Sequence, residues 1–148
     1  MRIALVSDEP YAVHAGVEAE LARRGHSVKR FGALASGCEG PWATAAEEAA
    51  LAIVRGECDE GVFFCWTGTG ISIAANKVAG IRAALCGDAV TAGAARVWNH
   101  ANVLCLSNRT LSPDVAREIL AAWFETQPGD KGSEGVRLCG EVDARHRA

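Results

Sequence analysis

Short apolar runs alternate with segments of helical character along most of the chain, and this alternation constrains the fold more than any other feature. Each run is dominated by aliphatic or aromatic residues and ends at polar or glycine residues, which is typical of buried strands. Strands that alternate with helices build parallel βαβ units with right-handed crossovers. We therefore expect an α/β fold with a doubly wound parallel sheet of about five strands and helices on both faces. The expected strands are Arg2–Ser7, His26–Phe31, Gly61–Cys65, Gly80–Leu85 and Asn102–Leu106.

Terminal signals mark the expected helices. Thr44 and Glu47 have the spacing of a capping box, so a helix is expected from this point to about residue 55. Asp88 is a suitable cap for a helix that runs through residue 96. Ser112 followed by Pro113 is a strong helix start, and that helix is expected to end near residue 125. Residues 11–24 also have helical spacing.

The rest of the chain carries weaker signals. Residues 32–41 and 127–135 are typical of loops, and residues 136–148 are short and charged with a basic end that we expect to be solvated. No repeat or second-domain signal is present. We therefore expect one domain over residues 1–126 and a tail over residues 127–148 that is able to contact a partner subunit.

Composition narrows the class of protein. The 148 residues are 49% hydrophobic and 22% charged, with a net charge of −3, so no global field favours nucleic acid or an acidic membrane. The polar start of the chain does not resemble a signal peptide, and no apolar run has membrane-spanning length. The 6 cysteines form no CxxC pair, which favours reduced thiols in a cytoplasmic protein. The 4 histidines have no metal-ligand spacing, so no metal is expected.

The stretch Gly61–Lys77 is where chemistry is expected. A buried strand ends at Cys65, a loop with Gly68 and Gly70 follows, and a helix of small residues begins. Free N–H groups at a helix start can bind an anion, and the positive helix end favours a thiolate at Cys65. The alternative is a common glycine turn beside an inert buried cysteine. As a dinucleotide fingerprint the loop is weak, because Ile73 stands where a third glycine belongs.

Other polar residues are predicted to meet Cys65 at the carboxyl edge of the sheet. Asp8 and Glu9 follow the first strand, Arg109 follows the fifth, and Trp98–His100 stand just before the fifth. Each has a plainer interpretation. In that interpretation Asp8 is only a turn or cap residue, Arg109 is a solvated cation, and Asn99 and Asn102 are turn formers, while Trp98 belongs to the core and His100 to the hydrogen-bonded surface.

The run CWTGTGISIAANKVAGIRAALC, which starts at Cys65, resembles the signature of ribose-5-phosphate isomerase B and the galactose-6-phosphate isomerase subunits. Ser7-Asp8, Asn99 with Asn102-Val103-Leu104, and Arg109 extend the resemblance over residues 1–125. It implies a five-stranded Rossmann-like fold and a homodimer, or a dimer of dimers, with its site at the subunit interface. It also implies cofactor-free aldose–ketose isomerisation of a sugar phosphate.

The resemblance also implies roles for single residues. Cys65 is the base that moves a proton between C1 and C2, and Thr67 and Asp8 open the sugar ring. Asn99 supports the substrate oxygens, while Arg109 and Arg137 hold the phosphate. The loop and helix start stabilise the cis-enediolate and contact the substrate through Gly68, Thr69, Gly70 and Ser72.

Three residues depart from the family pattern. Glu9 stands where a phosphate-binding His is usual, Trp98 stands at the position of the ring-opening His, and Trp66 replaces a loop glycine. His100 is not an obvious substitute for the lost histidine, although it is kept with Glu9, Trp66 and Trp98 among the substrate-contact candidates. These changes leave the sugar open. They also leave open a sugar-binding protein without turnover, and a nucleotide-binding module that uses the glycine loop.

Overall fold

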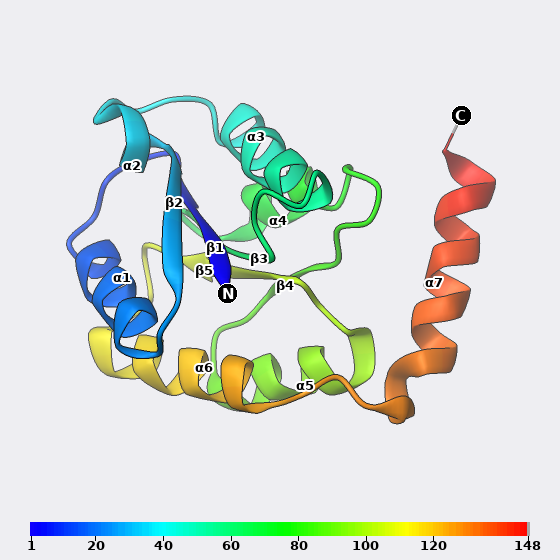
Figure 1. The fold of residues 1–148 in the computed structure, drawn as a ribbon. Helices are drawn as coiled ribbons and strands as arrows, with labels where there is room; N and C mark the ends of the chain where they lie inside the picture. The colour runs from blue at the N-terminus through cyan, green and yellow to red at the C-terminus, as the bar shows by residue number, and fades with distance from the viewer. Residues whose placement is uncertain (148) are drawn as a thin grey trace.

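The computed structural model describes residues 1–147, and Ala148, the last residue of the expected tail, lies outside the described residues. Its centre is a five-stranded sheet with the order β2-β1-β3-β5-β4, in which every neighbouring pair is parallel (Figure 1). This order confirms the expected doubly wound α/β fold. The strands are β1 (Arg2–Ser7), β2 (Ser27–Gly32), β3 (Glu60–Cys65), β4 (Ala83–Leu85) and β5 (Val103–Ser107).

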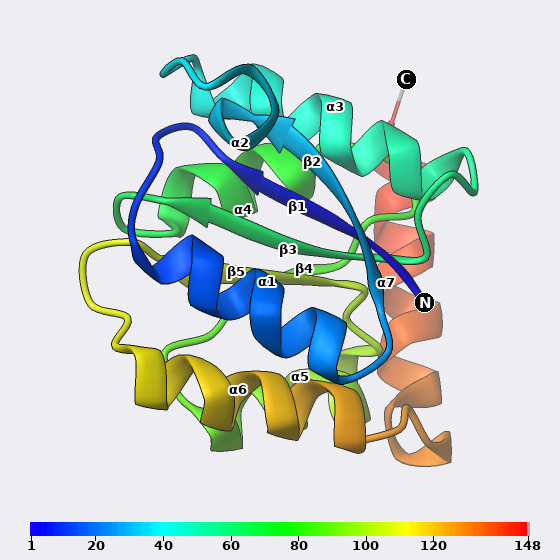
Figure 2. The same cartoon turned by 60° about the vertical axis from the view of Figure 1, so that its left-hand side comes forward.

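Helices cover both faces of the sheet (Figure 2). On one face lie α1 (Val13–Arg23), α5 (Ala89–Asn99) and α6 (Pro113–Glu125). On the other lie the short α2 (Ala33–Ser36), α3 (Trp42–Val54) and α4 (Thr69–Ala75). The caps Asp88 and Ser112 are confirmed, since each side chain accepts a backbone N–H of its helix.

Alternation along the strands separates the core into two parts. Leu5, Phe64 and Leu106 point to the layer of α1, α5 and α6. Phe63 and Cys65 point the other way, to the alanine-rich face of α3 and to Ile71 and Ala75 of α4. The thiol of Cys65 therefore belongs to the α3–α4 side of the sheet.

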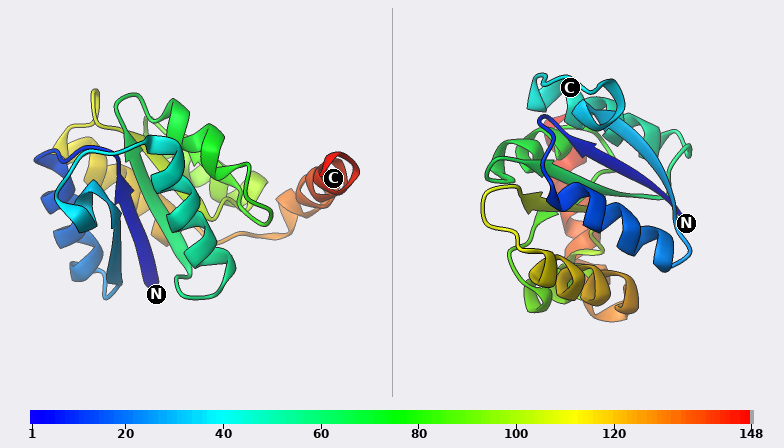
Figure 3. Two further views of the ribbon diagram at one scale, coloured as in Figure 1. Left: turned by 90° about the horizontal axis from the view of Figure 1, so that it is seen from above. Right: turned by 90° about the vertical axis from the view of Figure 1, so that its left-hand side faces the viewer.

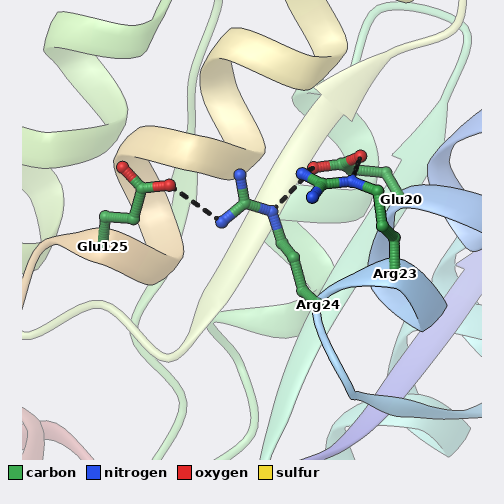
Figure 4. A network of polar contacts seen from close by, with 4 residues as sticks. All are labelled: Glu20, Arg23, Arg24 and Glu125. Atoms are coloured by element: carbon green, nitrogen blue, oxygen red, sulfur yellow. Dashed lines mark hydrogen bonds and ion pairs between the residues drawn. The ribbon is translucent and has the colours of Figure 1, made fainter.

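A four-residue ion network joins α1 to the end of α6 (Figure 4). Glu20 accepts hydrogen bonds from Arg23 and Arg24, and Arg24 also pairs with Glu125 at 3.1 Å. The two guanidinium groups lower the pKa of Glu20 to about 2. The network is far along the chain from the glycine loop, and we assign it a structural role.

Three expected boundaries were wrong. Helix α3 begins at Trp42 after an extended Pro41, so Thr44 lies inside the helix and makes no capping box. The fourth strand is only Ala83–Leu85, because the Asn76 side chain bonds both backbone groups of Ala83 and holds the preceding loop. The expected loop at residues 32–41 contains α2.

The C-terminal segment contains a helix that the sequence did not predict. A 3₁₀ turn η1 (Asp130–Gly132) leads into α7 (Ser133–His146), which stands beyond the amino ends of the strands (Figures 2 and 3). Ion pairs between successive turns support this helix, but none of its residues is buried. Its base is fixed where Gly132 meets the carbonyls of Val97 and Trp98, because a Cβ there would lie 2.4 Å from Val97 O.

Two further expectations can be compared with the structure. All 6 cysteines carry free thiols. Within residues 1–147, no helix combines the length and the apolar character that crossing a membrane requires.

Candidate active site

Cys65 ends the central strand β3, and its surroundings fix the strand end firmly. Its side chain is 5% exposed. Its carbonyl accepts the N–H of Asn108 at 3.0 Å, and the next carbonyl, that of Trp66, accepts both the Arg109 N–H and the Ser107 hydroxyl at 2.9 Å. The loop after β5 therefore holds the backbone that carries the thiol.

The loop between β3 and α4 needs glycine at its tightest point. Gly68 has φ +78°, and a Cβ built there would lie 2.6 Å from the Leu85 side chain and 3.0 Å from the Leu106 backbone. The hydroxyls of Thr67 and Thr69 are 2.6 Å apart, which ties the two ends of the turn together. No side chain caps α4, so its first N–H groups have no intrahelical partner. Ser72 lies one turn further along, half-buried.

Asp8 follows β1 and is positioned beside Cys65 by the strand register, which pairs Ser7 with Phe64. The side chain of Asp8 is 9% exposed, and its Oδ1 has no hydrogen-bond partner within residues 1–147. Burial raises the pKa of Asp8, and the nearby charges of Glu9 and Glu39 add to the effect. A buried carboxylate oxygen without a donor is costly, so this position is suited to a ligand hydroxyl.

Glu9 does not turn away from this edge. Its Oε2 accepts the Tyr11 hydroxyl at 2.7 Å, and the Tyr11 ring lies 5.9 Å from the ring of Trp66. Trp66 itself is 51% exposed, so Glu9 and the two aromatic rings form one wall at the mouth of the site.

Three residues in this region were not predicted from the sequence. Tyr11 is the only tyrosine in the chain and comes two positions after Glu9, which is a signal that the sequence offered. His14 and Asn108 had no such signal, because their 2.7 Å contact joins residues 94 positions apart.

The prediction that Trp98, Asn99 and His100 meet Cys65 at the carboxyl edge was wrong for a single chain. Helix α5 runs antiparallel to the strands, so residues just before β5 lie at the amino edge. His100 has φ +45°, its carbonyl accepts Arg82 Nε at 2.9 Å, and its ring contacts the Gly129 carbonyl at 2.8 Å. Its carbonyl and its ring are thus both engaged in hydrogen bonds at the amino edge.

The remaining candidates also divide between the two edges. Arg109 is exposed directly after β5, at the carboxyl edge. Arg137 lies on α7 at the amino edge, where it pairs with Glu134 and Glu141. Asn99 lines a cavity of about 510 Å³ between α7 and the loop before β4. Asn102 holds that loop by bonding Arg82 N and Gly80 O, as a turn former does.

The carboxyl edge thus has a thiol, a carboxylate with one unpartnered oxygen, a glycine loop and a cation on a doubly wound α/β sheet. Among residues 1–147 no group of three His, Cys, Asp or Glu side chains is arranged to hold a metal ion. This combination defines a small-molecule enzyme of the type in which ligands bind at the ends of the strands.

Comparisons with known proteins identify the family. Residues 3–139 match the family described as Ribose/Galactose Isomerase. The chain is 40% identical over 101 residues to ribose-5-phosphate isomerase B of Escherichia coli, covering 68% of both chains. It is 44% identical over 84 residues to the D-erythrulose-4-phosphate isomerase of Pectobacterium atrosepticum, covering 57% of this chain and 55% of that one.

The fold comparison agrees with the sequence comparison. The structure of ribose-5-phosphate isomerase B of Clostridium thermocellum matches with a TM-score of 0.89 at 34% identity, over 99% of this chain and 100% of that chain. The chain belongs to the ribose/galactose isomerase family, and it is an aldose–ketose isomerase.

Proposed function

We propose that this protein interconverts the aldose and ketose forms of a sugar phosphate through a cis-enediolate, with Cys65 as the base. The Cys65 thiolate takes the proton from C2 of the open aldose, and the electron pair moves through a new C1–C2 double bond onto O1. The thiol then returns its proton to C1, while the proton on O2 passes to O1 by way of Asp8 or Thr67. The observation that supports this best is Cys65 at the end of β3 beside the glycine loop and Asp8.

A base alone is inadequate for this step, because a proton α to a carbonyl is weakly acidic. The enediolate needs fixed donors, and the free N–H groups of Gly68, Thr69 and Gly70 are the available ones. Removing one such donor typically reduces the rate by roughly 10²–10³-fold. In this proposal the thiol and the loop supply the chemistry, and the route uses no cofactor.

We further propose that the complete site forms between two copies of the chain. Asn99 and Arg137 lie at the amino edge, so they can reach Cys65 only from a second copy. Helix α7 supplies surface for such contact, since Leu138 is 45% and Val142 48% exposed. Sedimentation at micromolar concentration is expected to give a dimer or tetramer, and a species of 15.5 kDa alone would contradict this.

Subunit mixing tests the shared site directly. Cys65→Ala and Asn99→Ala chains are each expected to be inactive. When they are unfolded together and refolded, a mixed dimer contains one site with both native residues, so about a quarter of wild-type activity returns. If both residues came from the same chain, no site in the mixture would be intact and activity would stay at the level of the single variants.

The sugar is proposed from Glu9. A phosphate carries nearly two negative charges, and a carboxylate about 4 Å away opposes each by about 1 kcal/mol in water and more when partly buried. We propose that ribose 5-phosphate is a poor substrate and that another sugar phosphate, or a less charged polyol-like sugar, is preferred. The different sugars in the names of the two relatives support such variation.

A sugar-binding protein without turnover is the second candidate, and Trp98 at the family's histidine position favours it. Tetrose, pentose and hexose phosphates, with the free sugars, should be incubated in D₂O. Deuterium entry at C1 or C2 supports the isomerase. Binding of a sugar without exchange in any member of the panel would support the second candidate.

A further inference from the structure

The loop that carries Asp8 and Glu9 rests on a chain of hydrogen bonds that the proposed reaction does not use. His14 Nε2 contacts Asn108 Oδ1 at 2.7 Å, and Asn108 Nδ2 donates to Ser7 Oγ at 3.2 Å. Ser7 Oγ in turn donates to the carbonyl of Glu9 at 2.6 Å. These contacts fix the main chain of Glu9 from the buried side of the loop.

The donor and acceptor roles along these hydrogen bonds follow from the protonation of His14. His14 Nδ1 accepts the backbone N–H of Tyr11 at 3.2 Å, so the ring proton is on Nε2 and is donated to Asn108. The His14 ring is 5% exposed and packs 4.6 Å from the Phe64 ring, and its burial lowers the pKa of His14. A neutral His14 therefore leaves the Asn108 amide and the Ser7 hydroxyl with one orientation each.

The side chain of Glu9 is fixed separately by Tyr11. The Tyr11 hydroxyl donates to Glu9 Oε2, and the neighbouring carboxylate raises the pKa of Tyr11 to about 12, so the hydroxyl remains a donor. Within residues 1–147, Glu9 Oε1 receives no hydrogen bond from the protein. Asp8 Oδ1 beside it is buried and also lacks a donor.

These atoms describe the ligand that the mouth of the site accepts. Asp8 lines a cavity of about 340 Å³ with Glu39, Glu48 and an Arg30 that is paired with Glu18. Outside this cavity, the half-exposed Glu9 lies beside the Tyr11 and Trp66 rings, which supply an apolar wall. Hydroxyl groups of a sugar satisfy such acceptors, whereas a phosphate dianion is repelled.

We propose that Tyr11 is a specificity-determining residue, which holds Glu9 at the mouth of the site so that this end accepts sugar hydroxyls and rejects a phosphate dianion. Without the Tyr11 hydroxyl, Glu9 can swing into solvent and the repulsion weakens. This inference rests on the proposed function, because it assigns the substrate end that the isomerase site receives. Ser7, Asn108 and His14 are positioning residues for the same loop.

The test measures binding with two simple probes, inorganic phosphate and D-ribose, by titration calorimetry on the full chain. In Tyr11→Phe, phosphate affinity is expected to rise about 3-fold and D-ribose affinity to fall about 3-fold. In Glu9→Gln, phosphate affinity is expected to rise about 10-fold, as removal of one opposing charge allows. The double variant is expected to match Glu9→Gln, because Tyr11 acts through Glu9.

A matched control variant tests whether the loss of any hydroxyl-to-carboxylate hydrogen bond changes the two affinities in the same way. Thr91→Val removes another hydroxyl-to-carboxylate hydrogen bond, the 2.8 Å contact with Asp88 at the start of α5, which involves neither Glu9 nor Tyr11. It is expected to leave both affinities unchanged. A merely structural role for Tyr11 would lower both affinities in Tyr11→Phe, and that outcome, or unchanged affinities, overturns the inference.

Exchange in D₂O separates the two proposals. Opposite changes in phosphate and D-ribose affinity, without deuterium exchange into any sugar by the wild type, would sustain the role of Tyr11 and refute the isomerase reaction. Exchange by the wild type with no change of affinity in Tyr11→Phe would do the reverse.

Discussion

The two edges of the sheet both bury charged side chains, but they do so in different ways. At the amino edge, Glu60 accepts Arg96 at 2.8 Å with one oxygen and Trp123 Nε1 at 2.8 Å with the other. Arg96 also donates to the Ala101 carbonyl and stacks 4.9 Å from the Trp123 ring, and only its Nε has no partner in residues 1–147. At the carboxyl edge, the carboxylate of Asp8 has an oxygen with no donor.

The difference shows that burial of charge does not by itself identify a site. The carboxylate of Glu60 is satisfied by its own chain, so this cluster stabilises the packing of α5 and α6 on β3. The carboxylate of Asp8 is left with unused acceptor capacity beside a thiol and a glycine loop, where the proposed substrate would bind. Variants at the two edges should therefore affect different quantities.

The largest expected effect is on catalysis at the carboxyl edge. Cys65→Ala is expected to reduce kcat/KM by about 10³-fold or more, the contribution of a positioned base, with little change in the free energy of unfolding. Cys58→Ala removes another buried thiol on the same side of the sheet. This control variant should keep its activity. Full activity in Cys65→Ala would contradict the mechanism.

Alkylation gives a second measurement of the same residue. In a Cys38→Ser/Cys139→Ser background, which removes the two exposed thiols, iodoacetamide is expected to label Cys65 before Cys58 or Cys86. Burial raises the pKa of Cys58, and that of Cys86 to about 11, so both should react slowly.

The next effect is on stability at the amino edge. Arg96→Met leaves Glu60 buried without its cation, and the free energy of unfolding is expected to fall by about 3–5 kcal/mol. Glu60→Leu/Arg96→Met removes both charges and should recover much of this loss. Urea denaturation measures both variants, and equal stability of the single variant and the wild type would show that the cluster is not a structural pair.

A smaller effect is expected at Glu9. Glu9→His replaces an opposing charge by a group that can donate to phosphate, so kcat/KM for ribose 5-phosphate is expected to rise about 10-fold, alone or with Trp98→His. Efficient turnover of ribose 5-phosphate by the wild type, weakened by Glu9→His, would refute the proposed substrate preference.

The smallest expected effect is on the free energy of unfolding, which the buried carboxylate of Asp8 lowers. Because burial raises its pKa above the ordinary 3.8, the folded state binds the proton more tightly than the unfolded state, so stability falls as pH rises through that interval. Asp8→Asn removes this cost and is expected to raise Tm at pH 7 by about 2–4 °C. The gain should disappear below about pH 3, where the aspartic acid is mostly neutral in both states. A constant gain across pH would exclude ionisation as its cause.

Local patterns in the sequence predicted most of the fold. The apolar run of β1, the cap at Asp88 and the Pro113 start were all correct because they depend on near neighbours. Thr44 failed as a cap because Pro41, three residues earlier, already provides the extended residue before the helix. Helix α7 was missed because it buries no apolar stripe, and its support comes from ion pairs between turns.

The candidate site was predictable only where residues directly follow strands. Cys65 ends a strand, Asp8 and Arg109 come within two residues of a strand end, and the parallel sheet brings their positions to one edge. Asn99 precedes a strand instead, and the antiparallel course of α5 puts it at the other end. The His14–Asn108 contact depends on the tertiary packing of α1 against the loop after β5, which no local pattern encodes.

The close approach of Gly132 to the carbonyls of Val97 and Trp98 joins the base of α7 to the end of α5. A side chain at residue 132 would collide with these two carbonyls and force the helices apart. With glycine there, the two helix ends are in direct contact. Asn99 directly follows Trp98 and ends α5, so it lies next to this junction. In the proposed shared site, a contact on α7 and the placement of Asn99 would therefore depend on the same junction at Gly132.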